Sequence, residues 1–105
     1  MKQINAVELK KMLDNKNGAK PLVLDVRESW EFRGGHVPGA KWIPMGQIVQ
    51  RIDELDSGAP IAVICETGNR SMTVAAFFDK KGFKTVYNVS EGTLGWRMEG
   101  YALER

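Results

Sequence analysis

Four consecutive apolar residues, Ile61–Ile64, constrain the fold of this chain more than any other stretch. A run without polar alternation is typical of a strand buried on both faces, as in a parallel sheet covered by helices on each side. The run ends at Cys65, the only cysteine, and a short polar loop containing Gly68 follows. With a helix predicted from Ser71 onward, Cys65 lies at the carboxyl end of a buried strand, where open α/β sheets hold their sites.

Strand and helix patterns alternate along the rest of the chain. Short apolar runs predict three further strands, at residues 21–26, 40–43 and 85–89. Helical spacing of hydrophobic residues and flanking cap signals predict helices or helical turns at residues 6–16, 29–32, 47–55 and 71–81, and a short one after residue 91. This alternation predicts an α/β fold of three layers, with helices flanking both faces of a mostly parallel central sheet.

The composition is that of an ordinary globular protein. With 105 residues, the chain is expected to form one domain, residues 1–105, around one core. Fifteen basic and thirteen acidic residues give a net charge of +2, and no basic run is longer than a pair such as Lys10-Lys11. Nucleic-acid binding is not expected, because it requires a basic surface or a recognisable binding motif.

The sequence contains no segment that predicts export or membrane insertion. Lys2, Glu8 and Lys10 interrupt the N-terminal segment too often for the apolar core of a signal peptide, and no later segment is long and apolar enough to span a bilayer. One cysteine cannot form an intrachain disulfide, so Cys65 is expected to be a free thiol in a reducing compartment. We therefore expect a cytoplasmic monomer.

The loop from Cys65 to Arg70 contains the groups that activate a thiol. The thiolate is the nucleophilic form, and a helix N-terminus, backbone amides and a nearby guanidinium all stabilise it. The loop supplies all three, because Arg70 closes it and a helix is predicted to begin at Ser71. The same groups would bind an oxyanion, such as phosphate or the sulfonate end of a thiosulfate-like donor. Alternatively, Cys65 is only a small core residue, since free cysteines are often buried.

Several motifs in the same order resemble those of the single-domain rhodaneses, a family of sulfurtransferases. The active-site loop of that family begins with cysteine and closes on an arginine before a helix, and here it reads Cys65-Glu66-Thr67-Gly68-Asn69-Arg70-Ser71. The other similar motifs lie at residues 24–27, 30–32 and 35–40 and at Gly82-Phe83, Gly92 and Trp96. The resemblance covers residues 4–101, which is nearly the whole chain.

This resemblance implies a five-stranded rhodanese-like sheet and a particular reaction. In such proteins the cysteine takes a sulfane sulfur from a donor, becomes a persulfide, and passes the sulfur to cyanide or another thiol. The donor would be thiosulfate or a persulfide, and the acceptor would be a small molecule or a protein thiol. The reaction would need no metal or organic cofactor.

The resemblance also assigns roles within the loop. Cys65 would carry the persulfide, and the backbone amides of residues 66–70 would cradle its terminal sulfur. Arg70 would orient an anionic donor or stabilise the thiolate, while Ser71 would cap the helix and place a hydroxyl nearby. The expected substrate-binding residues are Glu66, Thr67, Gly68, Asn69, Arg70 and Ser71.

Glu66 departs from the pattern of many active members of the family. They place a basic or neutral side chain after the cysteine, whereas a carboxylate here is expected to oppose both the thiolate and an anionic donor. This predicts slow turnover of thiosulfate, or a preference for a less charged or protein-bound donor.

Two other functions are compatible with these residues. Cysteine phosphatases also have a loop of backbone amides between a cysteine and an arginine. In those enzymes, however, five residues separate the cysteine from the arginine. Only four residues separate Cys65 from Arg70, and the shorter loop suits a sulfur atom better than a tetrahedral phosphate. The second alternative is an inactive domain that only docks a partner. Cys65 argues against it, since an inactive copy can lose its nucleophile without penalty.

The other conspicuous polar residues are interpreted as structural. Asp25 is expected where its strand leaves the core. Together with Arg27 and Glu31, it is predicted to form a partly buried ion network that ties the strand to its loop, in preference to an acid–base cluster. His36, the only histidine, lies in a segment that serves as scaffold in the family, so a structural role is expected for it.

Overall fold

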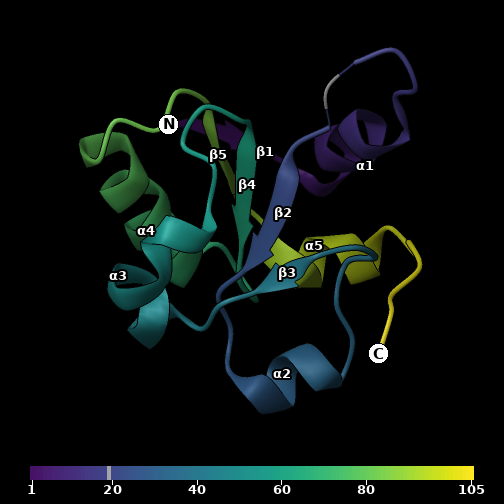
Figure 1. Cartoon of the computed structure of the whole chain (residues 1–105). Coiled ribbons are helices and arrows are strands. Elements are labelled where there is room, and N and C mark those ends of the chain that lie inside the picture. Colours follow the sequence, from purple (N-terminus) through teal and green to yellow (C-terminus); the bar gives the residue numbers. More distant parts are fainter. Residues whose placement is uncertain (19) are drawn as a thin grey trace.

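The computed structural model describes residues 1–18 and 20–105, and a parallel sheet forms its middle layer (Figure 1). The strands are β1 (Lys2–Ile4), β2 (Leu22–Asp25), β3 (Lys41–Trp42), β4 (Ile61–Ile64) and β5 (Val86–Val89). They lie side by side in the order β1-β5-β4-β2-β3, and each pairing is parallel. The predicted three-layer α/β fold with a five-stranded sheet is confirmed.

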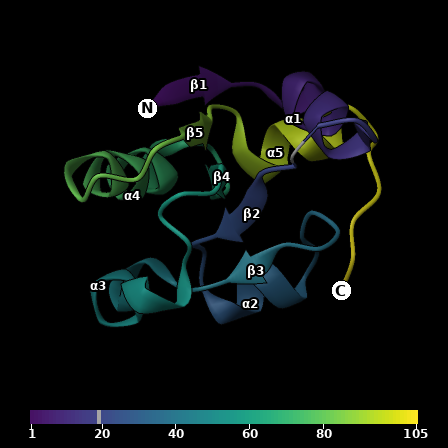
Figure 2. The same cartoon turned by 45° about the horizontal axis from the view of Figure 1, so that its top comes forward.

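Helices cover both faces of this sheet (Figures 1 and 2). They are α1 (Ala6–Asp14), α2 (Ser29–Arg33), α3 (Ile48–Arg51), α4 (Asn69–Lys80) and α5 (Gly92–Met98). Helices α3 and α4 pack on one face, and α1 and α5 pack on the other. No helix in the described part of the chain is long and apolar enough to cross a membrane.

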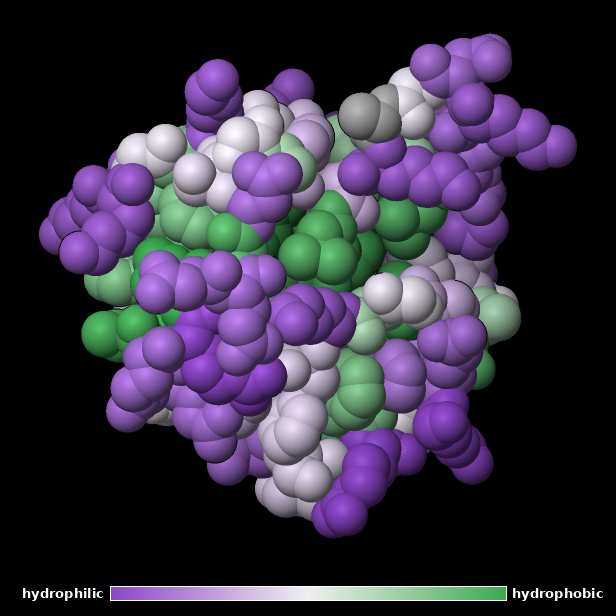
Figure 3. Space-filling model, in the orientation of Figure 1, coloured by the Kyte–Doolittle hydropathy of each residue, from purple (hydrophilic) through white to green (hydrophobic). Residues whose placement is uncertain are grey.

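Strand β4 contributes to a separate hydrophobic core on each of its faces. Ile61 and Val63 belong to the core that includes α3 and α4. Ala62 and Ile64 belong to the core that includes α1 and α5. All four side chains are buried, which explains why the run has no polar alternation. On the face seen in Figure 3, hydrophobic side chains show in a band from the left edge to the middle, between hydrophilic side chains above and below it.

Helix α4 begins two residues earlier than predicted. Gly68, with a φ of 96°, takes the position before the helix, so Asn69 is the first helical residue. Ser71 therefore lies inside the first turn, and its predicted role as the helix cap is wrong. The backbone freedom of glycine allows the loop to turn into the helix without a side-chain cap.

Other boundaries differ from the prediction for local reasons. The helix predicted at 47–55 is divided into a 3-10 turn (Met45–Gln47), the single turn α3, and a second 3-10 turn (Ile52–Glu54). Helix α1 ends at Asp14, before residue 16. Strand β1 was not predicted from the sequence, because it is three residues long and only Ile4 in it is buried.

A buried ion pair joins the end of β2 to the loop that follows it. Asp25 is fully buried and Arg27 is 2% exposed, and Arg27 Nη2 lies 2.8 Å from Asp25 Oδ2. Arg27 Nη2 also donates to the carbonyl oxygen of Gly35 over 2.8 Å. The expectation that Asp25 lies where the strand leaves the core is wrong. The predicted ion network exists for this pair, whereas Glu31 pairs with Arg70.

Candidate active site

The loops that leave β2, β4 and β5 gather at one edge of the sheet, because the carboxyl ends of parallel strands share an edge. Cys65 follows β4 directly and is 1% exposed. The first turn of α5 binds the backbone of Cys65 and of the residue that follows it. Thr93 N donates to Cys65 O over 2.9 Å, and Leu94 N donates to Glu66 O over 3.0 Å.

Two backbone amides and one hydroxyl surround the Cys65 sulfur. The amides of Gly68 and Ser71 donate to Sγ over 3.2 and 3.3 Å, and Sγ lies 3.4 Å from Ser71 Oγ. Burial disfavours the thiolate, but a thiolate could accept hydrogen bonds from the Ser71 hydroxyl and from the amides of Ser71, Gly68 and Thr67, and these outweigh burial. The pKa of Cys65 is therefore lowered from its ordinary value, which favours the nucleophilic form.

The shape of this loop requires glycine at two positions. Gly68 has a φ of 96°, and a Cβ there would lie 2.2 Å from the carbonyl oxygen of Ser90. Gly92 has a φ of 60°, and a Cβ there would lie 2.4 Å from the carbonyl oxygens of both Cys65 and Glu66. The cysteine loop and the turn before α5 therefore pack backbone against backbone, which leaves the loop amides directed at the sulfur.

Arg70 shares its charge with a carboxylate of another helix. Its guanidinium forms two hydrogen bonds with Glu31 of α2, over 2.8 and 2.9 Å. This bidentate pair lowers the pKa of Glu31 to about 2, and the hydrogen bonds that Arg70 donates to Glu31 raise the pKa of Arg70, with a smaller contribution from the charge of Cys65. Arg70, which was expected to orient an anionic donor, is therefore already paired with the Glu31 carboxylate.

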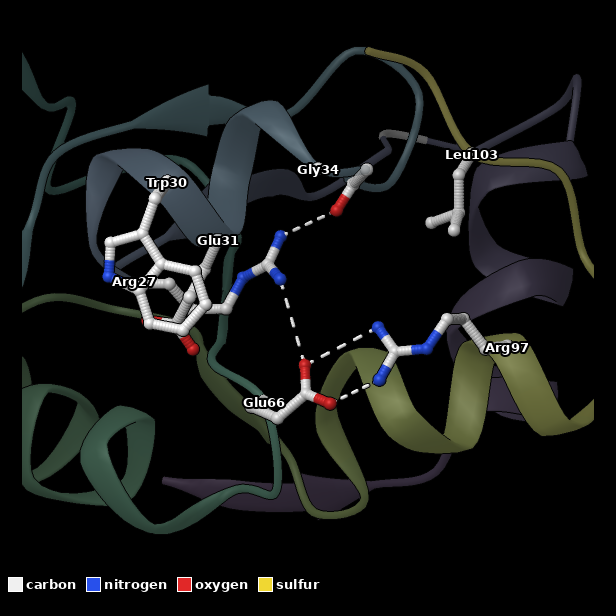
Figure 4. Close-up of a pocket in the computed structure, with 8 residues that line it drawn as sticks. Arg27, Trp30, Glu31, Gly34, Glu66, Arg97 and Leu103 are labelled. Carbon is white, nitrogen blue, oxygen red and sulfur yellow. Dashed lines mark hydrogen bonds and ion pairs between the residues drawn. The ribbon is translucent and has the colours of Figure 1, made fainter.

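The Glu66 carboxylate is compensated by two guanidinium groups (Figure 4). Arg97 of α5 binds it closely, Arg27 Nη1 lies 3.6 Å from its Oε1, and Thr93 Oγ1 donates to it. Burial raises the pKa of Glu66, but the hydrogen bonds from Arg97 and Thr93 outweigh burial and lower it. Because Arg27 and Arg97 balance the negative charge of Glu66, that carboxylate destabilises the Cys65 thiolate less than an unpaired one would.

A pocket of about 390 Å³ opens beside the loop (Figure 4). The Arg27–Glu66–Arg97 ion pairs run along it, and the indole of Trp30 beside them is 72% exposed. The lining residues are Arg27, Trp30, Glu31, Gly34, Gly35, Glu66, Arg97 and Leu103. Cys65, which is buried, is not among them.

The remaining predicted loop residues bring no buried side chain to the sulfur. Thr67 and Asn69 have exposed side chains, and Asn69 begins α4. The amides expected to cradle the sulfur were those of residues 66–70. Within that range the Gly68 amide donates to Sγ, and outside it the Ser71 amide also donates. The loop therefore holds the sulfur mainly with main-chain groups.

Three residues that bind parts of the cysteine loop, Asn88, Thr93 and Arg97, were not singled out from the sequence. Ser71 Oγ donates to Asn88 Oδ1 over 2.5 Å, and Thr93 and Arg97 bind Glu66. Asn88 carried a usable signal, because a polar residue inside a buried strand requires hydrogen-bond partners. Thr93 and Arg97 are four residues apart on one helix, but nothing in their spacing identifies Glu66 as the partner.

His36 has the contacts of a scaffold residue. Its ring stacks on Phe32 with the ring centroids 3.7 Å apart, and its Nδ1 lies 2.9 Å from Phe32 O. Among residues 1–18 and 20–105, no group of three or more His, Cys, Asp and Glu side chains is arranged to hold a metal ion.

Known proteins match this chain over most of its length. The family model for the rhodanese-like domain matches residues 5–99. YtwF of Bacillus subtilis, provisionally named a sulfurtransferase, is 36% identical over 99 residues, which cover 94% of this chain and 93% of YtwF. YrkF of the same species, provisionally named a sulfur carrier protein, is 42% identical over 74 residues, or 70% of this chain. The chain spans only 40% of YrkF.

A solved structure has the same fold. The crystal structure of a rhodanese-related protein from Thermoplasma volcanium superimposes with a TM-score of 0.87 at 31% identity. The match covers 99% of this chain and 98% of that one.

We predict that Gly68→Ala moves the pH midpoint of Cys65 alkylation by iodoacetamide to a higher value. The added Cβ would displace the loop from Ser90 and weaken the Gly68 amide bond to the sulfur. Gly82→Ala is the matched control, since Gly82 also has a left-handed φ but no neighbour within 4 Å of a Cβ. It should lower the free energy of unfolding by about 1–2 kcal/mol and leave the midpoint unchanged. Equal midpoints in both variants would contradict the proposed role of the loop geometry.

Proposed function

The chain belongs to the rhodanese-like domain family, and from this premise we propose that it is a sulfurtransferase that carries a sulfane sulfur on Cys65. The observation behind the proposal is the cradle of amides from Gly68 and Ser71 around a free thiol whose pKa is lowered. The names of the two relatives, a sulfurtransferase and a sulfur carrier, support the same chemistry.

In the first half of the proposed reaction, the Cys65 thiolate attacks the sulfane sulfur of the donor. A bond forms between Sγ and that sulfur while the bond to the rest of the donor breaks. The electron pair of the broken bond leaves with sulfite when the donor is thiosulfate, and with a thiolate when it is a persulfide. The Gly68 and Ser71 amides hold the attacking anion in place.

In the second half, a thiolate or cyanide acceptor attacks the outer sulfur of the persulfide. The S–S bond breaks and its electron pair returns to Sγ, so the Cys65 thiolate forms again in the same cradle. Atoms and electrons balance in both halves. The amides that activate the nucleophile also stabilise it as the leaving group, which suits a residue that must act as both.

The charges around the loop favour a donor with little negative charge. Arg70 faces Glu31, and Arg27 and Arg97 face Glu66, so each guanidinium is already paired with a carboxylate. A doubly charged anion such as thiosulfate would have to compete with these carboxylates. We therefore favour a small or protein-bound persulfide as the donor.

A free, active thiol also suits a reducing compartment, and we propose a cytoplasmic location.

We predict that Cys65→Ser reduces sulfur transfer to the uncatalysed background, because the alcohol is far less acidic than the thiol and forms no persulfide. The measurement is thiocyanate formation from cyanide, with thiosulfate and with a low-molecular-weight persulfide as donors. Circular dichroism and the urea midpoint should match those of the unchanged protein. Transfer above background in the folded variant would overturn the role of Cys65.

We further predict opposite effects from two neutralising substitutions of one ion pair. Glu66→Gln leaves Arg97 and Arg27 without their shared carboxylate, so the Cys65 pKa should fall and kcat/KM for thiosulfate should rise about three- to tenfold. Arg97→Gln leaves Glu66 less compensated, so the Cys65 pKa should rise and kcat/KM for thiosulfate should fall. Changes in the same direction would show that the substitutions act through loop structure rather than through charge.

A further inference from the structure

A chain of hydrogen bonds leads from the Cys65 sulfur to a buried amide that the reaction above does not use. Sγ lies 3.4 Å from Ser71 Oγ, and Ser71 Oγ donates to Asn88 Oδ1 over 2.5 Å. Asn88 is on β5, beside β4, and both it and Ser71 are fully buried. Its side chain therefore depends on protein partners for all of its hydrogen bonds.

The other contacts of Asn88 fix the orientation of its amide. Asn88 Nδ2 donates to Gly68 O over 3.3 Å and to Gln3 Oε1 over 2.9 Å. A backbone carbonyl can only accept, so the nitrogen must face Gly68 and the oxygen must face Ser71. The single hydroxyl proton of Ser71 is then directed at Asn88, and Ser71 Oγ accepts from the Cys65 thiol.

Loss of the thiol proton changes what Ser71 must do. A thiolate only accepts hydrogen bonds, so the Ser71 hydroxyl stabilises it only by turning its proton toward Sγ. Asn88 Oδ1 then loses Ser71, its only donor among the described residues, in a fully buried position. A buried acceptor without a donor is unfavourable. Asn88 and the thiolate therefore compete for one proton.

We propose that Asn88 is a positioning residue that keeps the Ser71 hydroxyl turned away from Cys65 until the sulfur becomes a thiolate. This inference deepens the proposed function and rests on it for its place in the cycle. In the persulfide, Sγ is uncharged and the hydroxyl stays on Asn88. When the acceptor attacks the outer sulfur, the S–S electron pair passes to Sγ and the hydroxyl turns to it. The proton remains bonded to Ser71 throughout, and only its direction changes.

Several charged groups also lie on the elements around the loop. They are Asp25 at the end of β2, Arg27 in the loop after β2, Glu31 on α2, Glu66 in the cysteine loop, Arg70 on α4, Glu91 before α5 and Arg97 on α5. The variants below exchange only uncharged residues, so this set is the same in all of them. Differences between the variants therefore report on hydrogen bonding.

The test is the pH profile of iodoacetamide alkylation in four proteins: the unchanged chain, Asn88→Leu, Ser71→Ala and the double variant. Asn88→Leu removes the competing acceptor, so the midpoint should fall by about half to one pH unit. Ser71→Ala removes the hydroxyl, so the midpoint should rise. In the double variant, the leucine should have no further effect, because there is no hydroxyl left to release.

A purely structural role for Asn88 predicts a different pattern. Loss of the bond from Asn88 Nδ2 to Gly68 O would loosen the loop and raise the midpoint equally with and without Ser71. That result, or an unchanged midpoint in Asn88→Leu, would overturn the proposal. Gln3→Ala is the matched control, because it removes a partner of Nδ2 but leaves Oδ1 on Ser71, and it should not move the midpoint. Asn88→Val, suited to a strand, replaces leucine if that variant does not fold.

Alkylation separates this inference from the proposed function, because no sulfur donor takes part. The expected pattern in a protein that accepts no sulfur would support the hydroxyl competition and reject sulfur transfer. A protein that transfers sulfur but shows the structural pattern would retain the function and reject the role of Asn88.

Discussion

The contact between the cysteine loop and the first turn of α5 is the interaction on which the rest of the site depends. The amides of Thr93 and Leu94 bind the carbonyl oxygens of Cys65 and Glu66, and Gly92 permits their close approach. With those carbonyls directed at α5, the amides farther along the loop are free to face the sulfur. Because β4 and β5 are neighbouring parallel strands, the cysteine loop after β4 and the turn after β5 lie side by side at the same edge of the sheet.

The ionic contacts around the loop have two different roles. The Asp25–Arg27 pair is buried and joins β2 to its loop, so it belongs to the scaffold. Glu31 and Glu66, the two carboxylates that line the pocket, each bind an arginine of a neighbouring element. This pairing leaves the hydrogen bonds from the Ser71 hydroxyl and from the backbone as the main stabilisation of the sulfur anion. Backbone amides carry no net charge, and they suit a sulfur whose charge changes during the cycle.

The sequence predicted the parts of this molecule that depend on local pattern. The apolar run of β4 was assigned with its observed bounds, and the loop after it was recognised from its own residues. The starting point of α4 was missed, since Ser71 was expected to cap the helix, whereas Gly68 makes the turn earlier with its backbone alone. Strand β1 is too short and polar to give a pattern, and only its pairing with β5 defines it.

The partners of Glu66 and Ser71 could not be predicted for a related reason. Arg97 is distant from Glu66 in the sequence, and it meets that carboxylate only because α5 begins at the same sheet edge as the loop. The polarity of Asn88 indicated that it has partners, but the fold alone decides which partners they are.

Intact-protein mass spectrometry tests the central claim, that Cys65 carries sulfur, most directly. The reduced protein and Cys65→Ser are weighed before and after incubation with thiosulfate and with a low-molecular-weight persulfide. The account predicts a gain of one sulfur atom in the unchanged protein, more complete with the persulfide, that is lost on adding cyanide and absent in the variant. No gain from either donor, with the protein folded and its thiol free, would contradict the account and favour a domain that only binds a partner.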